Sequence, residues 1–162
     1  MQALLFISTC TAGLDYSPCS YNKYNNQIYC EYAAAAKVLD AFRRNRNNTN
    51  IDILRLERVD DMTDDILSEI VDIVAAAASG NVRTVSLWFL ENVQKIPEAI
   101  GRFRKLQVFH VEYLKGLKVL PHGSMSFTSG SLDSIVCAHT NLQVIEPGAF
   151  QGITFIKSIV DL

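Results

Sequence analysis

The chain lacks the motifs that mark common catalytic sites. It has no Gly-rich phosphate loop, no G-x-S-x-G and no H-E-x-x-H, and it has only three histidines. His110 and His139 fall in segments expected to form adjacent strands, so they could approach one another. Two histidines without a third ligand nevertheless form a poor metal site. We therefore expect no enzymatic activity, no catalytic residue, no bound metal and no cofactor.

A dominant sign of charge is also missing. The 15 Lys and Arg residues nearly balance the 17 Asp and Glu residues, for a formal net charge of −2. Such a balance gives no general attraction to nucleic acid or to an anionic membrane. Beyond the first dozen residues, no stretch is long and apolar enough to span a bilayer. We therefore predict no nucleic-acid partner and no membrane span for this globular composition.

Cysteines are few, and none form a C-x-x-C pair, so the zinc signal is weak. Cys19 and Cys30 flank ten residues rich in polar and aromatic side chains. A disulfide between them would close a small loop and contribute about 3 kcal/mol. Cys137 falls at an expected core position and is predicted to be a buried thiol. Cys10 lies in a segment that we expect to be removed.

That segment, residues 1–13, is predicted to be a signal peptide. Residues 1–12 are apolar or small and uncharged, and Ala12 or Gly13 could precede a cleavage site. No Lys or Arg precedes the apolar run, so a buried first strand stays open as the alternative. Asn47-Asn48-Thr49 forms a sequon and predicts glycosylation at Asn47. Together with the disulfide, these features predict a secreted, extracellular protein.

What the chain does have is a recurring apolar pattern. Four segments carry apolar residues at offsets of zero, three, five and eight, and their starts lie 31, 24 and 26 residues apart. The sets are Ile51, Leu54, Leu56, Val59; Val82, Val85, Leu87, Leu90; Leu106, Phe109, Val111, Leu114; and Leu132, Ile135, Cys137, Thr140. Ile156 opens a fifth set. This L-x-x-L-x-L-x-x spacing is that of a leucine-rich repeat. It predicts an α/β solenoid with a short parallel sheet on its concave face.

The remaining segments suggest an N-terminal cap over residues 14–50, followed by repeats over residues 51–162. Within the cap, residues 14–32 are expected to be irregular and residues 33–44 helical. A second helix is predicted through residue 78, with Thr63 as its N-cap. The repeats are expected to be incomplete at the C-terminus, because the chain stops in a strand-like segment without a polar last repeat. A terminal face covered by a partner or a second copy is the alternative.

The residues between the apolar ones are the candidates for binding. Offsets four, six and seven of each set are expected on the concave face. The protein's single Trp is among them, and aromatic anchors beside Arg dominate the energetics of protein interfaces. The alternative is that Trp88 and Phe89 are covered by an insertion or by the N-terminal segment. The predicted partner-binding residues are Arg55, Arg58, Trp88, Phe89, His110, Glu112, Tyr113 and His139.

Two fragments carry a family resemblance: Pro18-Cys19 with Ile28-Tyr29-Cys30, and Ile145-Glu146-Pro147-Gly148-Ala149-Phe150. They resemble secreted leucine-rich repeat proteins of arthropods, among them relatives of the non-catalytic subunit of a shrimp luciferase, and more broadly Slit- and Toll-like repeats. The chain departs from that pattern in having two cap cysteines instead of four and no Asn at offset eight. The resemblance implies a recognition or accessory role.

The expected function is therefore that of a secreted leucine-rich repeat protein. It would bind an unidentified protein partner through its concave face. The alternative is a non-catalytic structural subunit that stabilises a partner enzyme in a heteromeric complex.

Overall fold

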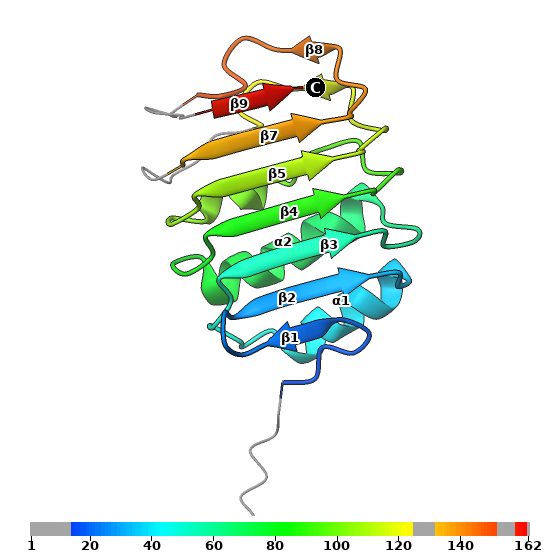
Figure 1. Cartoon of the computed structure of the whole chain (residues 1–162), viewed down its shortest axis with the longest axis vertical. Coiled ribbons are helices and arrows are strands. Elements are labelled where there is room, and N and C mark those ends of the chain that lie inside the picture. Colours follow the sequence, from blue (N-terminus) through cyan, green and yellow to red (C-terminus); the bar gives the residue numbers. More distant parts are fainter. Residues whose placement is uncertain (1–13, 125–131, 152–157, 162) are drawn as a thin grey trace, which may run out of the picture.

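The computed structural model describes residues 14–124, 132–151 and 158–161. Seven strands form one sheet in the order β1-β2-β3-β4-β5-β7-β9 (Figure 1). The strands are β1 Ser20–Asn22, β2 Gln27–Glu31, β3 Ile53–Glu57, β4 Thr84–Trp88, β5 Val108–Glu112, β7 Ser134–Ala138 and β9 Ser158–Asp161. Only β1 runs antiparallel to its neighbour. The protein is thus a mixed α/β structure with a mainly parallel sheet.

Two α-helices lie behind the sheet in the view of Figure 1, α1 Ala35–Arg44 and α2 Asp64–Ala78. The predicted second helix and its cap are confirmed, since the Thr63 side chain accepts a hydrogen bond from the backbone N–H of Ile66. A 3-10 helix, η1 Glu98–Arg102, follows β4. A small second sheet pairs β6 Val119–Leu120 with β8 Val144–Ile145. Neither α-helix of the described chain has the length and apolarity needed to cross a bilayer.

The core lies between the helices and the sheet face that they cover. Two columns of side chains, in register from β2 to β7, form its sheet side, and all ten are buried. They are Ile28, Leu54, Val85, Phe109, Ile135 and Cys30, Leu56, Leu87, Val111, Cys137. Every expected core residue of the four apolar sets is buried except Thr140, which is half-buried. Ile156 lies outside the described residues, as does the predicted signal peptide.

The expectation of an irregular segment over residues 14–32 is wrong, because this segment contains β1 and β2. Only Ile28 and Cys30 of β2 face the core, where both are fully buried. The three alternate positions of β2 carry polar or aromatic residues, so its local composition resembles a loop. Pairing with β3 over five residues provides the hydrogen bonds that make it a strand.

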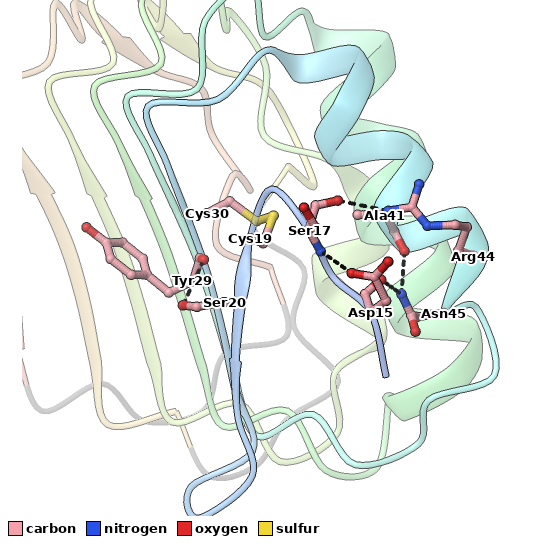
Figure 2. The surroundings of a disulfide bond; sticks show 9 residues. All are labelled: Asp15, Ser17, Cys19, Ser20, Tyr29, Cys30, Ala41, Arg44 and Asn45. Atoms are coloured by element: carbon pink, nitrogen blue, oxygen red, sulfur yellow. Dashed lines mark hydrogen bonds between the residues drawn. A yellow bond between two sulfur atoms is a disulfide. The ribbon is translucent and has the colours of Figure 1, made fainter. Parts of the chain in front are cut away.

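The predicted disulfide is present, with Cys19 and Cys30 joined by an S–S bond of 2.03 Å (Figure 2). Polar side chains of the last turn of α1 hold the segment before it. Arg44 donates to the carbonyl of Ser17 at 2.8 Å, and Asn45 donates to the carbonyl of Asp15 (Figure 2). The disulfide and these contacts attach the N-terminal segment to both the sheet and the helical layer.

Candidate interaction surface

The sheet face opposite the helices, here called the outer face, carries three columns of side chains from β2 to β7. The first two columns occupy strand positions that alternate with the core residues, while the third follows each strand directly. The first column is Tyr29, Arg55, Ser86, His110 and Val136. The second is Glu31, Glu57, Trp88, Glu112 and Ala138. The third is Tyr32, Arg58, Phe89, Tyr113 and His139.

All five residues of the third column have a left-handed backbone, with φ between 45° and 55°. None is Gly or Asn, the residues that adopt this conformation most readily, and each such residue costs on the order of 1 kcal/mol. The backbone N–H groups of Arg58, Phe89 and Tyr113 still donate to carbonyls of the next strand at 2.9–3.1 Å. Regular alternation would turn these side chains into the core. The positive φ instead keeps them beside the second column.

Their side chains form a continuous stack, which we call the aromatic ridge (Tyr32, Arg58, Phe89, Tyr113 and His139). The Arg58 guanidinium lies 5.5 Å from the Tyr32 ring centroid and 4.0 Å from that of Phe89. The ridge continues with ring centroids 4.3 Å apart for Phe89 and Tyr113, and 4.5 Å apart for Tyr113 and His139. Because the ring faces cover one another, a flat ligand cannot insert between them without breaking the stack. The ridge offers ring edges to a partner.

Beside the ridge, a charged network surrounds the carboxylate of Glu57, whose side chain is only 8% exposed. This carboxylate accepts hydrogen bonds from Arg55 at 2.7 Å, Arg58 at 2.5 Å and the Tyr29 hydroxyl at 3.1 Å. Burial, followed by the hydrogen bonds to Glu31 and Glu57, raises the pKa of Tyr29 above its ordinary value of 10.0. The phenol therefore stays protonated and donates to Glu57. The network fixes both arginines in place.

Trp88 lies at the centre of the outer face between two side chains of the first column. The Arg55 guanidinium sits 3.9 Å from the indole centroid, and the His110 ring meets it edge-on at 4.9 Å. Within the described structure, the Trp88 Nε1 and Arg55 Nε atoms are buried without a hydrogen-bond partner. Such donors lose water without gaining an acceptor. Within the described residues, the side chains of Arg55 and His110 contact Trp88, which is half-buried.

His110 contacts Glu112 through Nε2 at 3.3 Å from the Glu112 carboxylate. Burial lowers the pKa of His110 below its ordinary value of 6.5, the nearby Glu112 opposes that effect, and Arg55 adds a small further lowering. The imidazole is therefore neutral at pH 7. Among the described residues, no Lys or Arg side chain forms an ion pair with Glu112.

The structure brings the eight predicted binding residues together on one face. The exception to the sequence analysis is the suggested approach of His110 and His139. His110 is in register with Val136 and packs on Trp88, whereas His139 stacks on Tyr113. In the part of the chain that the structure describes, no group of three His, Cys, Asp or Glu residues could hold a metal.

Sequence reasoning missed Tyr29, Glu31 and Tyr32, which extend this face to β2. They were missed because their segment was expected to be irregular. The alternation of polar residues around Ile28 and Cys30 is the signal that could have placed them.

Comparison with protein-family models, with curated proteins and with solved structures finds no match to this chain. The interpretation of the outer face therefore rests on its geometry and chemistry alone.

Proposed function

We propose that this chain is a leucine-rich repeat solenoid that recognises another protein through its outer face. The support for the solenoid is the in-register parallel strands, each followed by a left-handed residue and a return segment on the core side. Stacked repeats of this kind expose one continuous strand face, which such proteins use for binding. The outer face would then be the concave one.

One observation carries the proposed binding role: side-chain contacts hold the aromatic ridge and Trp88 on a sheet face that neither α-helix of the described chain covers. Trp, Tyr and Arg are the residues that contribute most to binding at protein interfaces. Here their side chains are already ordered by stacking and by the Glu57 network. A partner that binds them loses little side-chain entropy.

We propose a non-catalytic role for the same face. Ser86 is in register with His110, and His110 contacts Glu112, which resembles the order of a Ser–His–acid triad. Ser86 is buried, however, and among the described residues no hydrogen bond joins it to His110. The His110 ring instead packs edge-on against Trp88. This arrangement favours binding over acyl transfer.

Secretion is part of the proposal, and the disulfide supports it because such bonds persist in oxidising compartments. The predicted sequon is compatible with it, since Asn47 is exposed in the turn that follows α1. A secretory route would therefore deliver the protein to an extracellular partner.

The role of a structural subunit in a heteromeric complex is the second candidate. Its support is the small sheet, where Val144 and Ile145 are 48% and 52% exposed. Another chain packed there would bury them. Light scattering of the purified protein tests this candidate, and a monodisperse monomer would count against it.

The binding role is tested by crosslinking from secreted medium, followed by affinity measurement with the purified captured protein. Trp88→Ala should weaken the affinity about thirtyfold, corresponding to about 2 kcal/mol for a central aromatic anchor. Tyr24→Ala is the matched control, because Tyr24 is 90% exposed at the β1–β2 turn and outside the outer face. Circular dichroism establishes that both variants are folded. Equal affinities for the two variants would remove Trp88 from the binding surface.

A further inference from the structure

We propose that the partner contacts the outer face with a positively charged segment, and that the hollow beside the aromatic ridge receives its Lys or Arg side chains. This inference rests on the proposed binding function and names the chemistry of the partner.

The hollow beside the aromatic ridge carries an excess of negative charge. Its lining contains three carboxylates, Asp60, Asp61 and Glu91, and one cationic side chain, Arg58. The excess of two negative charges at this one place equals the formal net charge of −2 of the whole chain. The hollow therefore attracts cationic groups.

Much of the acidity around the hollow lacks an internal counter-charge. Glu57 is neutralised by Arg55 and Arg58. By contrast, the Asp60 and Asp61 side chains form no ion pair within the described residues, and both are exposed. Glu91 contacts Lys115 only at 3.8 Å, with both side chains well exposed. A partner with cations at matching positions would gain the electrostatic complementarity that steers association and sets specificity.

The hollow has a volume of about 630 Å³. It lies beside the ridge, at the carboxyl ends of β3 and β4, and the walls combine aromatic and acidic side chains. Residues lining it include Tyr32, Arg58, Asp60, Asp61, Phe89 and Glu91. A Lys or Arg side chain suits such a site because its aliphatic stem packs on apolar surface while its charged end reaches carboxylates. Arg58 itself occupies the space between the Tyr32 and Phe89 rings, so the stem of an incoming side chain would pack on ring edges and on Tyr32, which is 70% exposed.

The same charges disfavour two other occupants. A second copy of this chain that placed its hollow against this one would bring two sets of carboxylates together, and like charges across an interface cost affinity. Nucleic acid would place phosphates against Asp60, Asp61 and Glu91, where repulsion replaces the attraction on which its binding depends. A cationic protein segment is the occupant that the surface favours.

The test is an unbiased selection of random 15-residue peptides displayed on phage against the purified, disulfide-bonded full chain. We expect the selected peptides to be enriched in Lys and Arg, and their affinity to fall as NaCl rises from 50 to 300 mM. Fluorescence anisotropy with the synthesised peptides should show about fivefold weaker binding to the double variant Asp61→Asn, Glu91→Gln, as expected for two exposed ion pairs. Asn suits the left-handed backbone of Asp61, whose φ is 56°, so the variant should fold.

Asp65→Asn combined with Glu98→Gln is the matched control, because it makes the same charge change on the helical side. Phe89→Ala distinguishes the proposed binding function of the outer face from the inference that the bound segment is cationic. Peptides that lose affinity with Phe89→Ala, but are not cationic and not salt-sensitive, overturn the charge inference and leave the binding function standing. If no selected peptide is weakened by Phe89→Ala, both are overturned.

Discussion

The two faces of the sheet differ in how uniform they are along each column. On the core side, every member of the two columns is apolar or Cys, and one could replace another with only a change of volume. On the outer face, a single column runs from Tyr to Arg to Phe to Tyr to His. Each outer residue touches a specific neighbour, such as Arg58 on Phe89 or His110 on Glu112. The core face is determined by burial, whereas the outer face is determined by pairwise chemistry.

The comparison also separates stability from function. The core face gains free energy from burial at every position. The ridge retains five left-handed non-Gly residues, each of which costs free energy that Gly would save. We interpret that difference as support for a binding role, because the ridge keeps large side chains at positions where the backbone conformation favours Gly.

The largest expected effect is on the core side. Leu87→Ala removes a fully buried side chain from a packed column and should lower the free energy of unfolding by about 3 kcal/mol. Val136→Ala, on the half-buried outer face, should cost less than about 1 kcal/mol, since less apolar surface is lost. Urea denaturation of both variants measures the difference. Equal losses would contradict the distinction between the two faces.

A smaller effect is expected when Gly and Ala variants are compared at two positions in and directly after β5. The difference in their free energies of unfolding should have opposite signs at the two positions. At Tyr113, Gly should be more stable than Ala by about 1 kcal/mol, because Ala must adopt the left-handed backbone. At His110, in β5, Gly should instead be less stable than Ala by about 0.5–1 kcal/mol. Chemical denaturation of the four single variants isolates the backbone term, since each pair removes the same ring. The same order at both positions would show that the left-handed column stores no strain.

A pH dependence of modest size should arise from His110. Its pKa is lowered in the folded protein, so the unfolded chain binds a proton at higher pH than the folded one. The contribution of His110 to stability is therefore complete above about pH 6.5. It is lost as the pH falls from there toward the lower folded pKa. Thermal melts of the wild type and His110→Gln from pH 8 to 5 should show that the difference between their melting temperatures changes below pH 6.5. A difference that stays constant over this range would exclude the titration of His110.

The smallest effect on stability is expected from modification at Asn47, which lies before β3 and away from the ridge that follows the strands. Protein secreted from eukaryotic cells should lose mass on treatment with an N-glycosidase, and Asn47→Gln should abolish that shift. Its melting temperature should stay close to that of the wild type because Asn47 is exposed. A shift retained in Asn47→Gln would place the glycan elsewhere.

The sequence by itself determined the features that follow from local periodicity. Burial requires apolar residues at regular offsets, so the spacing alone assigns Leu54, Leu87 and Val111 to the core. The second helix was equally accessible, since Thr63 and the acidic first turn mark its start. These signals lie within a few residues of the element that they specify.

Tertiary structure alone decided that residues 27–31 form a strand and that the ridge exists. β2 depends on hydrogen bonds to β3, which is 22 residues away in sequence beyond a helix. The left-handed backbone at Phe89 and Tyr113 contradicts the local preference of aromatic residues, and it persists because their N–H groups bond to the next strand while their rings stack across it. Contacts between strands set both features, and the alternation around Ile28 and Cys30 is only a weak local sign of β2.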